Sequence, residues 1–383
     1  MDTAATERKR RRIPAGLLGM IAMVIAVEAF IVHREPDLMR HKIVDWRTTS
    51  RQSTRNAPKA KLLAFGDSMV KFGVQPRVLK TETGRKAFNL AVCGGPPPVS
   101  YFLLRRALNA GGKPDAIIVD FTKLHVAEGP RSELKHYPWH VFLKLREAIE
   151  LSWSMRDADF LARTMTRAWL PSVGNRIALR NNIVAAFDGQ AQSEAEISNF
   201  VGFNRAVNNN AQVNAKNPAF LDVAVPPGLQ PVPDTWKPDP VNAKYVKRFL
   251  DLAAARQIPV FCILPPQSPG TQARLDAEGG DANNVAWLRR LESRYSNLTM
   301  VDIRHAGYDR TVFVDQVHLD GEGAQVLSTD LGRFLNERLS HPSTDAPRWV
   351  SASPFTGPPA QFVLEDIGQS RIAVKEPRAG RKL

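Results

Sequence analysis

Three residues that could together perform acyl transfer stand at two distant places in the chain. Ser68 closes the run Lys-Leu-Leu-Ala-Phe-Gly-Asp-Ser that begins at Lys61, while Asp315 and His318 stand three residues apart before a glycine-rich segment. A serine hydroxyl becomes a useful nucleophile when a histidine takes its proton and a carboxylate holds the imidazole in the required tautomer. We therefore predict Ser68 as nucleophile, His318 as base and Asp315 as the orienting acid. A lone Gly-Asp-Ser is also typical of an ordinary turn, so the prediction requires the two runs to meet in the fold.

Three segments resemble sequence blocks of the SGNH/GDSL hydrolase superfamily. Residues 66–68 match the nucleophile block, residues 89–94 look like the second block, and the Asp-x-x-His of residues 315–318 matches the last one. The resemblance covers residues 60–125 and 240–340. It implies an esterase or O-acyltransferase on a flavodoxin-like three-layer sandwich, similar to the membrane-anchored acetyltransferases of exported polysaccharides.

The resemblance also implies an oxyanion hole, and one part of that hole departs from the family pattern. The backbone N–H groups of Ser68 and Gly94 are the implied donors. Where the family has Gly-x-Asn-Asp, this chain has Asp120-Phe-Thr-Lys. The side-chain amide donor is therefore missing, and Thr122 is a candidate that could replace it. A different donor from the insertion, or slow catalysis without this donor, is the alternative.

The elements that must position these residues alternate between apolar strands and helices, which predicts an α/β fold with a parallel sheet covered on both faces. The five expected strands are residues 61–65, 86–92, 116–121, 258–264 and 298–303. In the strand order 2-1-3-4-5, the first and third strands diverge at their carboxyl ends. Ser68, Gly94 and the 315–318 loop would then surround one crevice.

A long insertion, residues 122–241, interrupts the pattern after the third strand. Helices are expected at 138–154 and 157–168, and the asparagine- and proline-rich remainder predicts loops. An insertion at this place would overhang the crevice as a lid. Its histidines and aromatic residues, among them His125, are of the types found in metal sites and in sugar-binding surfaces. Their spacing fits no closed metal site, so we expect no metal; ordinary packing is the alternative to a sugar surface.

The amino-terminal region predicts a membrane anchor. Residues 13–32 are apolar except for Glu28, and a basic cluster at residues 8–12 precedes them. About twenty helical residues suffice to cross a bilayer, and flanking positive charge stays in the cytoplasm. We expect a single-pass inner-membrane protein whose body lies on the periplasmic or extracellular side. A signal peptide cleaved near residues 27–29, or a buried core helix, is the alternative.

This anchor divides the chain into five expected parts. They are a cytoplasmic tail at 1–12, the transmembrane helix at 13–32, a polar linker at 33–59, the hydrolase-like domain at 60–340 and a flexible tail at 341–383.

The formal net charge of +14 is compatible with a nucleic-acid partner, but the distribution of the charge along the chain argues against one. Residues 1–12 contain five Lys and Arg against two acids, and residues 33–59 contain seven against three. The excess therefore flanks the apolar segment, and no zinc-finger or aromatic–basic RNA motif appears. We expect no nucleic-acid partner.

Two cysteines in an exported protein could form a disulfide. In the expected strand order, Cys93 and Cys262 are separated by three strand spacings, roughly 14 Å. A disulfide requires Cα atoms within about 7 Å, so we expect both to remain thiols.

Together these patterns predict a serine-dependent esterase or O-acyltransferase without a cofactor. Its expected partners are an acylated glycan or another ester substrate, the membrane, and proteins of the cell envelope. The alternative is a catalytically inactive domain of the same shape that binds glycan or scaffolds an envelope complex. The missing third-block amide favours this alternative, and the serine with its Asp-x-x-His pair opposes it.

Overall fold

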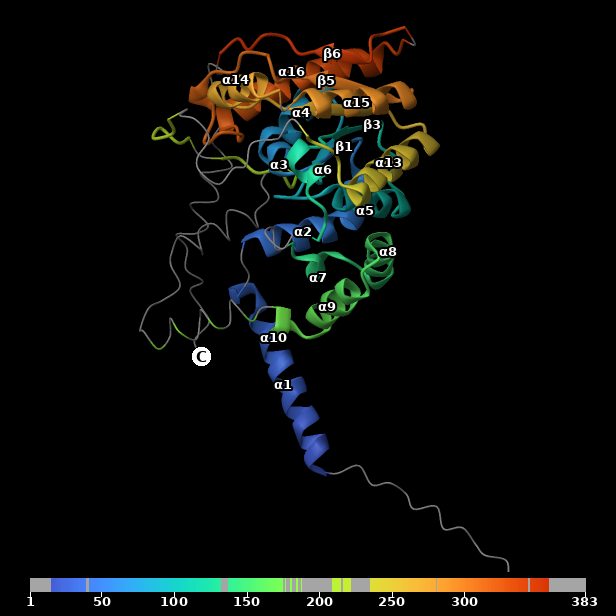
Figure 1. Ribbon diagram of the computed structural model, residues 1–383, viewed down its shortest axis with the longest axis vertical. Coiled ribbons are helices and arrows are strands. Elements are labelled where there is room, and N and C mark those ends of the chain that lie inside the picture. Colours follow the sequence, from blue (N-terminus) through green and yellow to red (C-terminus); the bar gives the residue numbers. More distant parts are fainter. Residues whose placement is uncertain are drawn as a thin grey trace, which may run out of the picture.

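The computed structural model describes residues 15–38, 41–131, 137–174, 209–214, 216–221, 235–279, 281–343 and 345–357, with isolated positions between 176 and 187. Its centre is a six-stranded sheet in the order β2-β1-β3-β4-β5-β6, and every neighbouring pair is parallel (Figure 1). The strands are β1 (Leu62–Phe65), β2 (Ala87–Asn89), β3 (Ala116–Val119), β4 (Val260–Leu264), β5 (Leu298–Asp302) and β6 (Trp349–Ser351). The predicted α/β fold with a parallel sheet is confirmed, and the first five strands have the predicted order.

The sixth strand corrects the prediction of five. β6 lies in the segment predicted to be a flexible tail, and it extends the sheet beyond β5. The Met300 N–H donates to the Arg348 carbonyl at 2.6 Å. The Arg289 guanidinium covers the Trp349 ring, 3.7 Å from its centroid. Two half-exposed residues and one exposed residue carry little alternating pattern, so the strand depends on partners that only the tertiary fold supplies.

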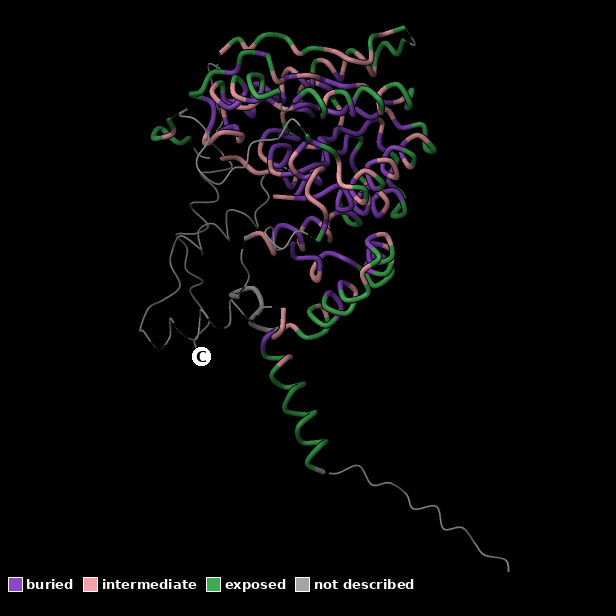
Figure 2. Tube along the Cα trace, in the orientation of Figure 1, coloured by how far each residue is buried: buried purple, intermediate pink, exposed green. Residues whose placement is uncertain are grey.

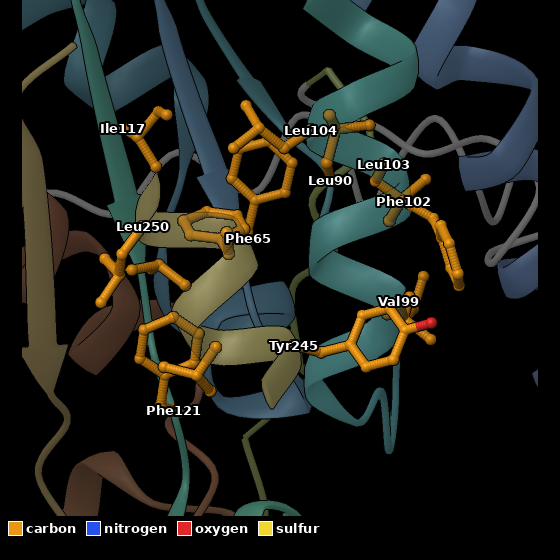
Figure 3. Close-up of a cluster of buried hydrophobic side chains, with 14 of the residues drawn as sticks. Phe65, Leu90, Val99, Phe102, Leu103, Leu104, Ile117, Phe121, Tyr245 and Leu250 are labelled. Atoms are coloured by element: carbon orange, nitrogen blue, oxygen red, sulfur yellow. The ribbon is translucent and has the colours of Figure 1, made fainter. Parts of the chain in front are cut away.

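Helices cover both faces of the sheet because successive strand side chains point to opposite sides. Leu63 and Phe65 face one core, shown in Figure 3, whereas Leu62 and Ala64 face the other. The first core is covered by α5 (Pro97–Asn109), α13 (Pro240–Ala255) and α15 (Ala282–Arg294). The second is covered by α3 (Ser68–Gly73), α4 (Pro76–Thr83) and α16 (Gly321–Ser340). α14 (Pro269–Ala277) and the short 3₁₀ helices η1 (Ala57–Lys59) and η3 (Arg310–Val312) complete this part.

The predicted linker at 33–59 contains a helix that belongs to the folded domain. α2 (His41–Arg55) places Trp46 at 0% exposure in the first core. The Trp46 ring makes edge contacts with Trp139 and Phe142. Three other inward positions of α2 are polar, at Asp45, Thr49 and Ser53. A stripe of polar residues does not give the apolar periodicity by which a buried helix is recognised in a sequence.

The insertion also folds against the domain. Its helices are α6 (Lys123–Ala127), α7 (Trp139–Phe142), α8 (Leu145–Met155), α9 (Ala158–Trp169) and α10 (Pro171–Gly174). α9 is close to the helix predicted at 157–168, whereas the helix predicted at 138–154 is divided into α7 and α8. A later piece of the insertion contacts both site-bearing loops. The Gln212 N–H donates to the Lys71 carbonyl at 3.1 Å, and the Asn214 side chain donates to the Leu319 carbonyl at 2.9 Å.

The first helix, α1 (Ala15–Leu38), leads away from the sheet and exposes its apolar side chains from Leu17 to Phe30 (Figures 1 and 2). Glu28 on this helix accepts a hydrogen bond from the Ser172 N–H at 2.9 Å, at the start of α10. The sequence predicts a membrane span here. Among the described residues, however, no helix has both the length and the hydropathy for a bilayer crossing.

Candidate active site

The nucleophile turn is built at the carboxyl end of β1. Gly66 has φ +139°, and a β-carbon at this position would lie 1.9 Å from an oxygen of Asp120, so only glycine fits. The Asp67 side chain caps α3 by accepting the Met69 N–H at 2.7 Å, and the Asp67 N–H donates to Asp120 at 3.1 Å. These bonds fix the turn and leave Ser68 half-buried at the first position of the helix.

The histidine loop precedes α16 and is fixed by its own carboxylate. One oxygen of Asp315 accepts the Val317 N–H at 2.9 Å and the His318 N–H at 2.8 Å. The other accepts the Nδ1–H of His318 at 2.7 Å. Burial would raise the pKa of the Asp315 carboxyl, but the bonds from His318 and the two amides outweigh it and hold the pKa below its ordinary value. The carboxylate is therefore charged at neutral pH.

The two loops meet, as the sequence analysis requires. The Ser68 hydroxyl donates to His318 Nε2 at 2.7 Å, across 250 positions of sequence. With Nδ1–H committed to Asp315, Nε2 presents its lone pair to the serine, which is the tautomer of a general base. The edge of Phe72 packs on the imidazole with ring centroids 5.6 Å apart. The His318 side chain is 22% exposed, so a substrate can reach this junction.

The predicted backbone donors also lie near each other. The loop after β2 packs on the nucleophile turn, where the Val92 N–H donates to the Gly66 carbonyl at 3.1 Å. Gly94 has φ +66°, a left-handed conformation that favours glycine. Within the described part of the chain, neither the Ser68 N–H nor the Gly94 N–H has an acceptor. Both are thus available for a developing oxyanion.

Thr122 does not supply the missing third donor. Its hydroxyl has one proton, and that proton is donated to Asp67 at 2.5 Å. Thr122 instead stabilises a buried pair of carboxyls, Asp67 and Asp120, each 3% exposed. Burial, and then the charge of Asp67, raise the pKa of Asp120 well above its ordinary value. His125 also approaches this pair, with Nε2 3.4 Å from Asp67.

A cleft with about 400 Å³ of empty space, part of it open to solvent, is lined by Met69, which follows Ser68, by Thr122 and by residues of β4. Ser68, Asp315 and His318 are not among the residues that line it. A chain of ionic contacts lies along it. Asp281 accepts from both Lys123 and Arg304, and Arg304 also pairs with Asp302. The sequence carries no signal for this network, because its members come from three separate segments with no shared spacing.

Two further predictions concern the two cysteines and the histidines of the insertion. Cys93 and Cys262 are both thiols, and burial raises the pKa of each. Among the described residues, no three potential ligands gather as a metal site. His125 contacts Asp67, whereas His140 lies in the insertion, where burial and Arg167 lower its pKa to about 4. His136 lies outside the described residues.

Comparison with known proteins gives no assignment for this arrangement. No protein-family model matches the chain, and no curated protein matches it.

Proposed function

We propose that this protein is a serine-dependent acyl-ester hydrolase or O-acyltransferase that acts on exported or cell-surface glycans. The observation that carries the proposal is the continuous chain of hydrogen bonds from Asp315 through His318 to Ser68. These residues match the nucleophile and base blocks of SGNH/GDSL hydrolases, and membership of that superfamily, with its flavodoxin-like three-layer framework, is part of the proposal.

The proposed reaction has two steps. His318 Nε2 takes the Ser68 proton as the serine oxygen forms a bond to the ester carbonyl carbon, and the oxyanion is held by the N–H groups of Ser68 and Gly94. The ester C–O bond then breaks, and His318 returns the proton to the leaving alkoxide. In the second step, water or a sugar hydroxyl gives its proton to His318 and attacks the acyl-serine. The bond to the Ser68 oxygen then breaks, and His318 returns the proton to that oxygen. Water gives hydrolysis, and a sugar gives transfer.

The glycan assignment depends on the location of the domain. The apolar side chains of α1 are exposed, with Met23 at 68%, and burying such surface away from water is favourable. We therefore also propose that residues 13–32 attach the protein to the membrane and that the domain lies on the periplasmic or extracellular side. Carbonate-washed membranes should retain the full-length chain but not a chain that begins at residue 41. Recovery of both in the soluble fraction would contradict the attachment.

The activity itself is tested with an O-acetylated polysaccharide and with phenyl acetate, using the unmodified protein and Ser68→Ala. We expect acetate release, or acetyl transfer to added oligosaccharide, from the unmodified protein and none above background from the variant. Product analysis separates the two reactions, because transfer yields an acetylated acceptor and hydrolysis yields free acetate. Equal rates for both proteins would contradict the proposal.

A non-catalytic glycan-binding or envelope scaffold protein is the second candidate. The commitment of the Thr122 hydroxyl to Asp67 favours it, because the side-chain donor of the oxyanion hole is then absent at the expected position. Such a protein should bind acetylated polysaccharide equally well with or without Ser68 and should release no acetate. Calorimetric titration of both proteins with the same polysaccharide distinguishes this candidate from the enzyme.

A further inference from the structure

The peptide group that carries the Gly94 N–H is held by α2. The indole N–H of Trp46 donates to the Cys93 carbonyl at 3.1 Å. That carbonyl and the Gly94 N–H belong to one planar peptide unit. A bond to the carbonyl therefore fixes the direction in which the N–H points. It also polarises the peptide, which makes the N–H a stronger donor.

The N–H of Cys93 is held by Asp45, the residue before Trp46 in α2. Asp45 accepts the Cys93 N–H at 2.8 Å and pairs with Lys71 at 3.0 Å. Both side chains of this ion pair are at most 2% exposed. Lys71 belongs to α3, the helix that begins with Ser68. Asp45 thus links the glycine loop to the nucleophile helix through buried contacts.

A cation from α2 lies directly over the glycine. A methyl group placed on Gly94 would be 3.6 Å from the Lys42 ammonium. The same ammonium lies 5.3 Å from the centre of the Tyr137 ring. Positive charge close to Gly94 favours negative charge that develops on a carbonyl oxygen bound beside this residue, and more so where water is excluded.

We propose that α2 completes the oxyanion hole that the third block leaves open. Trp46 orients and polarises the Gly94 N–H through the Cys93 carbonyl, Asp45 holds the same loop against α3, and Lys42 adds positive charge over it. Trp46 and Asp45 are positioning residues, because they act through the peptide. This inference rests on the proposed function and names groups outside the segments that resemble the family blocks.

The test compares phenyl acetate with its thiono analogue, in which sulfur replaces the carbonyl oxygen. Sulfur is a weaker hydrogen-bond acceptor, so the rate with the thiono ester depends less on the oxyanion hole. The variants are Trp46→Phe, which removes the indole N–H donor and keeps a smaller aromatic ring, and Lys42→Met. Exposed residues provide matched controls, Trp153→Phe on α8 and Lys247→Met on α13. A fall in the folded fraction would lower both rates equally.

Loss of one direct donor costs about 100- to 1000-fold, so a weakened donor should cost less. We expect Trp46→Phe to lower kcat/KM for the oxygen ester by roughly 5- to 50-fold and for the thiono ester by less than about threefold. Lys42→Met should lower kcat/KM for both esters, because negative charge also develops on the sulfur of the thiono ester. Lys42→Arg should recover most of the loss, and both controls should match the unmodified protein. Equal losses of Trp46→Phe on the two esters, or no loss in Lys42→Met, would overturn the role of α2 while leaving the reaction intact. Absence of Ser68-dependent turnover in the unmodified protein would instead overturn the proposed function, and this inference with it.

Discussion

The triad and α2 are two regions of one site, and they differ in how they are built. Asp315 and His318 are 43% and 22% exposed and contact each other and Ser68. Asp45 and Trp46 are almost completely buried and contact backbone and core. A substrate can reach the first region but not these two side chains. Changes in the triad should therefore alter chemistry with little effect on stability, whereas changes in the buried part of α2 should alter both.

The largest expected effect is on the triad side of this comparison. Ser68→Ala and His318→Ala should each lower kcat for phenyl acetate by on the order of 10⁴- to 10⁶-fold, and the double variant should be no worse, because the two residues act as one unit. Thermal unfolding should remain within a few degrees of the unmodified protein, since both side chains are only partly buried. Losses that multiply in the double variant would contradict the pairing.

The largest expected effect on stability is on the α2 side. Asp45→Ala leaves the Lys71 ammonium buried without its partner, which typically costs about 3 to 5 kcal/mol of unfolding free energy. Replacing both residues, as Asp45→Leu with Lys71→Met, should recover much of that loss, because a buried ion pair is often no more stabilising than apolar packing. Urea denaturation measures all three proteins. If Asp45→Ala lowers the unfolding free energy by less than about 1 kcal/mol, the Asp45–Lys71 ion pair behaves as an exposed one, which would contradict this prediction.

A smaller effect should appear in the pH dependence of stability, and its source is the buried carboxyl pair of Asp67 and Asp120. The folded-state pKa of Asp120 is raised, so the folded protein binds a proton that the unfolded chain releases near pH 4. The contribution of this proton to the free energy of unfolding is therefore complete below about pH 4, and it is lost as the pH rises toward the folded-state pKa of Asp120. Asp120→Asn keeps the acceptor for the Asp67 N–H and should flatten this decline. An unchanged pH profile of urea midpoints would contradict a protonated Asp120.

The triad and the sheet were predictable from the sequence, whereas α2 and β6 were not. Ser68 and His318 stand in short motifs beside apolar strands, and strand order then brings the two loops to one edge. α2 carries no such signal, because its inward positions at Asp45, Thr49 and Ser53 are polar, and Asp45 and Thr49 bond to groups far away in the sequence. Asn210, for example, donates to Thr49 at 3.0 Å across 161 positions. Thr122 was a reasonable candidate by position, but its proton is used by Asp67, which no spacing reveals.

The central claim is that Ser68 is an activated nucleophile. Fluorophosphonate labelling followed by mass spectrometry of the intact protein and its peptides tests this most directly, since the reagent reacts with serines that a histidine has activated. The account predicts one adduct per chain, located on the peptide that contains Ser68 and absent from Ser68→Ala and His318→Ala. An unlabelled protein, or labelling that persists in Ser68→Ala, would contradict it.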